Sequence, residues 1–190
     1  MKIKSLKLNI TIAFAVAVSF VILPVRATVQ QCHMDQRQMQ NQGEILFGGK
    51  TYLAQSFVPS APGQRICRVK VTIRKIGPQA RALTLRLLTP AFGPMADPVT
   101  IPAAAIPMGV SVQLFEFGCN DAPLNGAFHL LQLESPTSRI GDYAWRGAGT
   151  NPYVQPANGG RGWRNVSSGA AAQWSSLGQW DFAFETHMCD

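Results

Sequence analysis

A run of eleven residues in the first half of the chain, residues 66–76 (ICRVKVTIRKI), places the strongest constraint on its fold. Val69, Val71 and Ile73 recur with a period of two, and Arg68 and Lys70 occupy positions between them. This alternation predicts a β-strand with one apolar face, whereas a helix would leave these residues without a continuous apolar stripe. Because the apolar face needs cover, we expect a second sheet packed against it.

Residues 1–27 have the pattern of a cleaved secretory signal peptide. Lys2, Lys4 and Lys7 precede an apolar segment over residues 10–25, and small residues stand at the expected cleavage site before Thr28. The apolar segment is short for a bilayer span, so we expect no membrane span after cleavage. The sequence therefore predicts an exported protein, periplasmic or extracellular, with an extended lead-in over residues 28–44 and one domain over residues 45–190.

Removal of the leader lowers the positive charge of the chain. The full sequence contains 17 Lys and Arg against 10 Asp and Glu; four of the basic residues lie in the leader, which leaves thirteen against ten, a balance of +3. A charge of this size does not favour a nucleic-acid partner. The remaining basic residues gather in one region, which fits the solvated face of a sheet better than an anion site: Arg65, Arg68, Lys70, Arg74, Lys75, Arg81 and Arg86.

The four cysteines predict two disulfides, because an even number of cysteines in an exported chain forms a covalent framework. None of their spacings is typical of a zinc site or a thioredoxin-like motif. Three connectivities are open. We favour Cys67–Cys119, which would join two neighbouring strands, together with Cys32–Cys189, which would join the two ends of the domain.

Further alternating segments predict about eight strands and no long helix. We expect strands at residues 52–58, 66–76, 82–89, 110–117, 127–134, 142–145 and 179–186, and an edge strand or loop at 99–106, where prolines interrupt the pattern. For 127–134, periodicity alone leaves a short helix as the alternative. The phase of the apolar residues changes within 110–117, so we expect a β-bulge near Leu114. The predicted fold is all-β, a single β-sandwich of the jelly-roll kind stapled by disulfides.

Several short motifs occur in a recognisable order along this predicted sandwich: AQSF at 54–57, ICRV at 66–69, LTLRL at 83–87, GDYAW at 141–145, NPY at 151–153 and DFAFET at 181–186. The order resembles exported bacterial jelly-roll modules, both choice-of-anchor-like and carbohydrate-binding-like. The resemblance covers residues 52–186 and implies a noncatalytic sandwich. This chain differs from those modules in its four cysteines, and we expect no sorting tail.

The sequence contains no motif of a known catalytic centre: no GxSxG, HExxH or phosphate-binding loop occurs. Glu116 and Glu134 could form a glycosidase-like pair, but acidic residues on strands usually face solvent. We interpret His129 as a packed strand residue. His33 and Asp35 are too few for a metal site. We expect no enzymatic activity, no cofactor and no metal.

The best candidate for a binding site is the segment between residues 146 and 178, which is rich in glycine, asparagine and serine. Aromatic rings in such a loop can stack on sugar rings, with planar polar groups beside them. The predicted platform comprises Trp145, Tyr153 and Trp163 with Asn151, Arg161 and Arg164; Trp174 lies in the same segment. The alternative is that the tryptophans fill the open end of the sandwich as core residues.

Two functions of different classes follow from the sequence. One is a binding module for a glycan or another cell-surface polymer. The other is a structural or protein-interaction component of the envelope or secreted matrix that binds no small ligand. Exposed tryptophans would favour the first, and an apolar patch or an open edge strand would favour the second.

Overall fold

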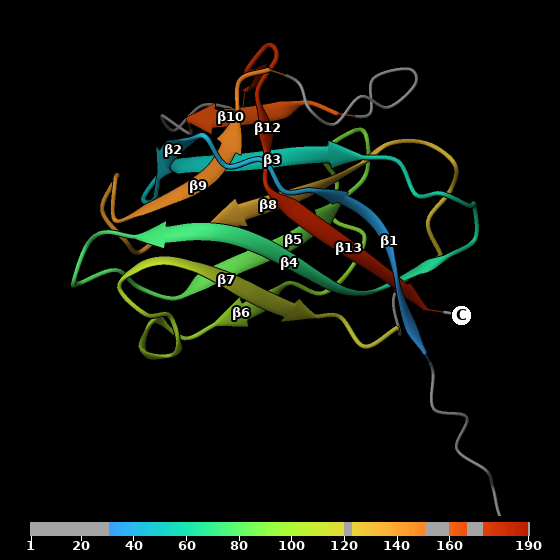
Figure 1. The fold of residues 1–190 in the computed structure, drawn as a ribbon, viewed down its shortest axis with the longest axis horizontal. Helices are drawn as coiled ribbons and strands as arrows, with labels where there is room; N and C mark the ends of the chain where they lie inside the picture. The colour runs from blue at the N-terminus through green and yellow to red at the C-terminus, as the bar shows by residue number, and fades with distance from the viewer. Residues whose placement is uncertain (1–30, 120–122, 151–159, 167–172, 190) are drawn as a thin grey trace, which may run out of the picture.

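The computed structural model of the chain describes residues 31–119, 123–150, 160–166 and 173–189, and these residues form two antiparallel sheets packed face to face (Figure 1). The predicted all-β sandwich is therefore confirmed. The described residues contain thirteen strands instead of about eight, because several edge strands span only two or three residues and carry no periodic signal.

One sheet has seven strands, in the order β1-β13-β4-β9-β12, with β2 also paired to β9 and β7 also paired to β4. In Figure 1, β4, β7 and β13 pass in front of β5 and β8 of the other sheet. The strands of the seven-stranded sheet are β1 (Cys32–Gln38), β2 (Gly43–Phe47), β4 (Arg65–Lys75), β7 (Gly109–Glu116), β9 (Tyr143–Ala148), β12 (Asp181–Phe182) and β13 (Phe184–Cys189).

The second sheet has six strands in the order β11-β10-β3-β8-β5-β6. A 3-10 turn, η1 (Ala103–Ala105), follows its edge strand β6, at the place where prolines interrupt the sequence pattern. The strands are β3 (Thr51–Phe57), β5 (Leu83–Leu88), β6 (Val99–Ile101), β8 (His129–Glu134), β10 (Gly162–Val166) and β11 (Trp174–Ser176).

Strand β4 organises the core, as its alternation predicts. Val69, Val71 and Ile73 are fully or almost fully buried, and they belong to one cluster with leucines of β5 and aromatic residues of β9, β12 and β13. Burial of a side chain of this size contributes about 1.5–3 kcal/mol. On the opposite face of β4, Lys70 pairs with Glu185 at 2.9 Å and Arg74 pairs with Glu44 at 2.9 Å.

The β-bulge predicted near Leu114 is absent, and that prediction is wrong. β7 pairs with β4 in one continuous register from Gly109 to Glu116. Phe115 is buried in the core, whereas Val110 and Val112 point away from it and are exposed. The apolar residues change phase because β7 has apolar residues on both faces. The register shifts instead lie in β1 and in β13.

The start of the described chain belongs to the seven-stranded sheet. The segment predicted as an extended lead-in contains β1, which pairs with β13 from Cys32 to Gln38. The predicted signal peptide, residues 1–27, lies outside the described residues. Within the described ranges, no helix is long and apolar enough to cross a membrane.

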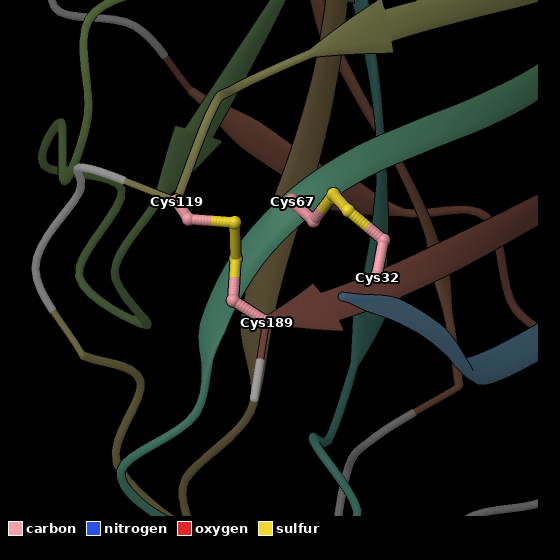
Figure 2. The surroundings of a disulfide bond; sticks show 4 residues. All are labelled: Cys32, Cys67, Cys119 and Cys189. Carbon is pink, nitrogen blue, oxygen red and sulfur yellow. A yellow bond between two sulfur atoms is a disulfide. The ribbon is translucent and has the colours of Figure 1, made fainter. Parts of the chain in front are cut away.

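Both disulfides are present, but with a different connectivity from the predicted one. The bonds join Cys32 to Cys67 and Cys119 to Cys189, and no cysteine is free (Figure 2). The expected pairs, Cys67–Cys119 and Cys32–Cys189, are wrong as bonds. All four cysteines nevertheless form one cluster, and the sulfur atoms of Cys32, Cys67 and Cys119 lie within 4.8 Å of one another. Strand order alone therefore does not select a partner.

Candidate functional site

Trp145 does not belong to a surface platform. It lies on β9 with 0% of its surface exposed, and its ring stacks on Phe182 with centroids 4.4 Å apart. Its indole N–H donates to the carbonyl oxygen of Ala183 at 3.0 Å. The alternation of β9 explains this position, because Tyr143 and Trp145 both point between the sheets. For this residue the core interpretation is correct and the binding prediction is wrong.

Trp163 lies elsewhere, on the outer face of the six-stranded sheet. Its neighbour Gly162 approaches Phe182 between the sheets, so the next side chain points outward. The two predicted arginines flank it: Arg161 precedes β10 and Arg164 follows Trp163, and both are exposed. By alternation, Arg164 points to the side opposite Trp163. The other predicted platform residues, Asn151 and Tyr153, lie outside the described residues.

An aromatic cluster surrounds Trp163 on this outer face. The ring of Phe92 stacks on Trp174 with centroids 4.9 Å apart and meets Trp163 edge-on at 5.7 Å. All three side chains are half-buried. They pack with Phe128 over three buried apolar residues of the outer face, Ala54, Leu88 and Leu130. We call Phe92, Trp163 and Trp174 the aromatic cluster.

Phe92 reaches this position from the segment after β5. Because β8 and β3 separate β5 from β10 in the sheet, that segment has to extend over the outer face. Phe92 itself has φ of +61°, a backbone conformation that residues other than glycine rarely adopt. Its amide N–H donates to the carbonyl oxygen of Thr89 at 2.9 Å, and the side chain of Thr89 accepts a hydrogen bond from Gly93. This turn holds the ring against the two tryptophans.

Polar side chains continue the outer face next to the aromatic cluster. Registered pairs place Trp163 opposite Ala54, Ala54 opposite Gln132, and Gln132 opposite Arg86. Three inter-strand spacings correspond to about 14 Å. The carboxylate of Glu134 accepts from Arg86 Nε at 2.7 Å and from Gln132 Nε2 at 2.7 Å. This polar group, Arg86, Gln132 and Glu134, presents charged and amide groups in a fixed arrangement.

Two buried polar atoms, one within the aromatic cluster and one next to it, have no hydrogen-bond partner among the described residues. They are the indole Nε1 of Trp163 and the side-chain oxygen of Asn165. Asn165 lies two residues after Trp163 and opposite Trp174, so it faces the same side of the sheet. Buried polar groups without partners are rare in proteins, because leaving a hydrogen bond unmade costs free energy. This part of the outer face thus holds one donor and one acceptor with unused capacity.

The structure separates the two glutamates considered as a glycosidase pair. Glu116 ends β7 on the outside of the seven-stranded sheet, and Glu134 lies on the outside of the six-stranded sheet. Their carboxylates point away from each other across the sandwich, whereas a glycosidase needs both on one sugar. Glu134 is instead held by Arg86 and Gln132.

His129 is buried in β8, as predicted. Its ring lies 6.0 Å from that of Phe57 and contacts the sulfur of Met95 and the carbonyl oxygen of Asn125. Burial lowers its pKa from the ordinary value of 6.5, and the contact with Asn125 opposes this shift. His129 is therefore a packed strand residue, and burial favours its neutral form.

The other candidate metal ligands, His33 and Asp35, contact protein groups. Nε2 of His33 lies 3.2 Å from the side-chain amide of Gln64, and the carboxylate of Asp35 accepts a hydrogen bond from the N–H of Ser60. These contacts tie β1 to the segment between β3 and β4.

The basic cluster is divided between the two sheets. Lys75 is buried and donates to the carbonyl oxygens of Ala103 and Ile106, while Arg86 lies on the opposite sheet beside Glu134. Together with the pairs formed by Lys70 and Arg74, these partners use much of the positive charge internally. The region is not one continuous cationic surface.

The sequence prediction missed Phe92 and Gln132, and it considered Glu134 only as half of a glycosidase-like pair. One signal was available: Leu88 and Leu130 occupy outward positions of their strands yet are apolar, which indicates that something covers them. The chain gives no local indication that this cover is Phe92. Comparison of the sequence with protein-family models and with curated proteins finds no match.

Proposed function

We propose that this protein is a noncatalytic binding module for a glycan, and that the outer face of the six-stranded sheet is its binding surface. The observation that carries the proposal is the aromatic cluster lying beside the polar group on one sheet face. Flat half-exposed rings favour contact with the C–H faces of sugars, and guanidinium, amide and carboxylate groups hydrogen-bond hydroxyls. A sheet supports this arrangement rigidly, so little conformational entropy is lost on binding.

The cellular setting that we propose is export, to the periplasm or beyond the cell. Two disulfides are typical of proteins in oxidising compartments. The sequence of residues 1–27 has the features of a cleaved leader, and the two-sheet architecture is compatible with the jelly-roll modules that the motifs resemble. Mass spectrometry of the exported protein should find a mature chain that begins near Thr28; an intact chain from Met1 would refute cleavage.

Retention on insoluble polysaccharides tests the binding function. Cellulose, chitin and peptidoglycan sacculi serve as separate probes, and we expect the wild-type protein to bind at least one of them. Trp174→Ala should abolish this retention, because it removes the ring that stacks on Phe92 in the aromatic cluster. Arg86→Ala should weaken it. Val112→Ala, on the outside of the other sheet, is the matched control and should bind normally.

The outcomes separate a binding surface from a structural cover. Equal retention of wild-type protein and Trp174→Ala would place the binding site elsewhere. Absence of retention on all three polymers would contradict the glycan proposal. Each variant needs a circular dichroism spectrum and a thermal unfolding curve, so that loss of binding is distinguished from loss of fold.

A second candidate function, protein interaction, is favoured by β7. This strand forms a free edge of the seven-stranded sheet among the described residues, and its outward side chains Val110, Val112 and Leu114 are 53%, 55% and 42% exposed. An exposed apolar edge strand is a template for pairing with another chain. A hollow of about 150 Å³ next to it is lined by Val112, Lys70 and Glu185 among others.

Light scattering coupled to size-exclusion chromatography tests this alternative. If β7 pairs with a second chain, the wild-type protein should be larger than a monomer, and Val112→Lys should restore the monomer mass. A monomeric wild-type protein at high concentration would remove self-association through β7.

A further inference from the structure

The four cysteines converge on one point of the fold. The sulfur atoms of Cys32, Cys67 and Cys119 all lie within 4.8 Å of one another, and the sulfur of Cys189 is bonded to that of Cys119 (Figure 2). The residues come from four separate segments: the start of β1, the start of β4, the turn after β7 and the end of β13. Cys67, Cys119 and Cys189 are buried, and Cys32 is partly buried.

Backbone contacts independent of the disulfides hold these four positions together. Cys32 and Cys189 are register partners in the β1–β13 pair. The carbonyl oxygen of Cys67 accepts hydrogen bonds from the N–H groups of Phe117 at 2.8 Å and Gly118 at 3.2 Å. Gly118 and Cys119 both have positive φ, which turns the chain after β7 back towards β4. Reduction of the disulfides would leave this framework in place.

A cavity next to the sulfur atoms is lined by one basic and one acidic side chain. Its volume is about 280 Å³, and it is lined by Cys32, Cys67 and Cys119 together with Arg68, Glu116 and Gly118. Nε of Arg68 is buried and has no hydrogen-bond partner among the described residues. This guanidinium N–H can donate a hydrogen bond to a cysteine thiolate, and its positive charge offsets that of Glu116 in the same lining.

We propose that the reduced protein binds one zinc ion through the four cysteine thiolates. Tetrahedral zinc has Zn–S bonds of about 2.3 Å, which place the sulfur atoms about 3.8 Å apart. Cys32, Cys67 and Cys119 already lie within 4.8 Å of one another, and rotation of the Cys189 side chain, once its bond to Cys119 is reduced, would bring in the fourth sulfur. The spacing of the cysteines along the sequence excludes a recognisable zinc motif, so only the fold reveals the site.

The chemistry is balanced when a dithiol reductant is the electron donor. Two dithiols transfer four electrons and four protons to the two disulfides, producing four protein thiols and two oxidised reductant molecules. Zn²⁺ then binds four thiolates with release of four protons, giving a site of net charge −2 that Arg68 partly offsets. In the oxidised protein two disulfides join the four cysteine-bearing segments, and in the reduced protein one zinc ion would join them.

Cobalt substitution tests the site directly. The full-length purified protein is reduced with a phosphine under nitrogen and titrated with Co²⁺, whose tetrahedral thiolate complexes show intense visible d–d bands and a sulfur-to-metal charge-transfer band. We expect the signal to saturate at one Co²⁺ per chain and to disappear when one equivalent of Zn²⁺ is added. The oxidised protein should give no such spectrum.

Two variants distinguish the proposed site from incidental thiol binding. Cys119→Ser with Cys189→Ser should remove the tetrathiolate spectrum. Arg68→Gln should weaken zinc affinity about tenfold, whereas Arg74→Gln, on the same strand but paired with Glu44, should leave it unchanged. Failure of the reduced chain to give the spectrum, including by unfolding without recovery when metal is added, would overturn the inference, as would a stoichiometry of one metal per two chains.

Discussion

Replacing Trp145 with alanine removes the largest fully buried side chain of the sandwich core. The ring is 0% exposed, stacks on Phe182 at 4.4 Å and donates a hydrogen bond to Ala183. Truncation of such a side chain costs about 3–5 kcal/mol, because transfer and cavity terms add. The carbonyl oxygen of Ala183 also accepts a hydrogen bond from Thr72 at 3.3 Å, so it keeps one partner after the truncation.

The same truncation at Trp163 should cost much less. This ring is half-buried on the outer face, and its indole N–H has no hydrogen-bond partner to lose among the described residues. Partial burial of an aromatic side chain contributes about 1–2 kcal/mol. The two alanine variants should therefore differ by about 2 kcal/mol or more in the free energy of unfolding.

Urea unfolding of the oxidised protein, followed by circular dichroism, measures this difference. The free energy of unfolding must have the same slope against urea concentration in all variants for the comparison to hold. Trp145→Phe is the matched control, because it keeps a buried ring and should recover much of the lost stability. A loss below about 1 kcal/mol for Trp145→Ala would refute its position in the core, and equal losses at both sites would show that Trp163 is also a structural residue.

The other predictions concern the disulfides, the strand phase and the dependence of stability on pH. Val71→Asp buries an unpaired charge and should prevent folding. Lys70→Asp should cost only about 1 kcal/mol, because it loses an ion pair with Glu185 and places a like charge opposite it on a partly exposed face. Similar behaviour of the two variants would mean that the assigned phase is wrong. Stability should fall as the pH drops below 6.5, because burial lowers the pKa of His129 and only the unfolded chain gains the proton. The free energy of unfolding should fall again as the pH drops through and below 4.5, because the hydrogen bond from Lys70 lowers the pKa of Glu185 in the folded chain and the unfolded chain gains the proton first. Thermal unfolding between about pH 7 and pH 3 checks both, and constant stability would contradict them. Peptide mapping without reduction should recover two linked pairs, and any other connectivity would contradict the structure: Cys32–Cys67 and Cys119–Cys189.

The sequence predicts the burial of a side chain best where burial depends only on alternation within one strand. Val69, Val71 and Ile73 are buried because the side-chain period of a strand is two and one face must be dry. The same logic places Leu83, Leu85 and Leu87 in the core. It fails at β7, where valines at alternate positions face solvent, since periodicity indicates which residues share a face but not which face is covered.

The candidate site was only partly predictable from the sequence. Trp163 was predicted as a binding residue, which stays a prediction, and the structure places it half-buried on the outer face beside Gly162. Trp145 was assigned to the same platform because it precedes the same loop region, but it belongs to another strand of the other sheet. Residues that are close in the sequence can therefore lie on different sheets and face different sides of the sandwich.

The sequence by itself determined the class of fold, the positions and phases of the main strands and the presence of two disulfides, because these depend on local alternation, turn residues and the number of cysteines. Only the tertiary structure decided which sulfur atoms are bonded, which tryptophan is core, and which loop places Phe92 over β10. These features depend on strand order and register, which join residues 150 or more positions apart, such as Gln36 and Thr186. No local pattern encodes such a pairing, since it results from the packing of the whole chain.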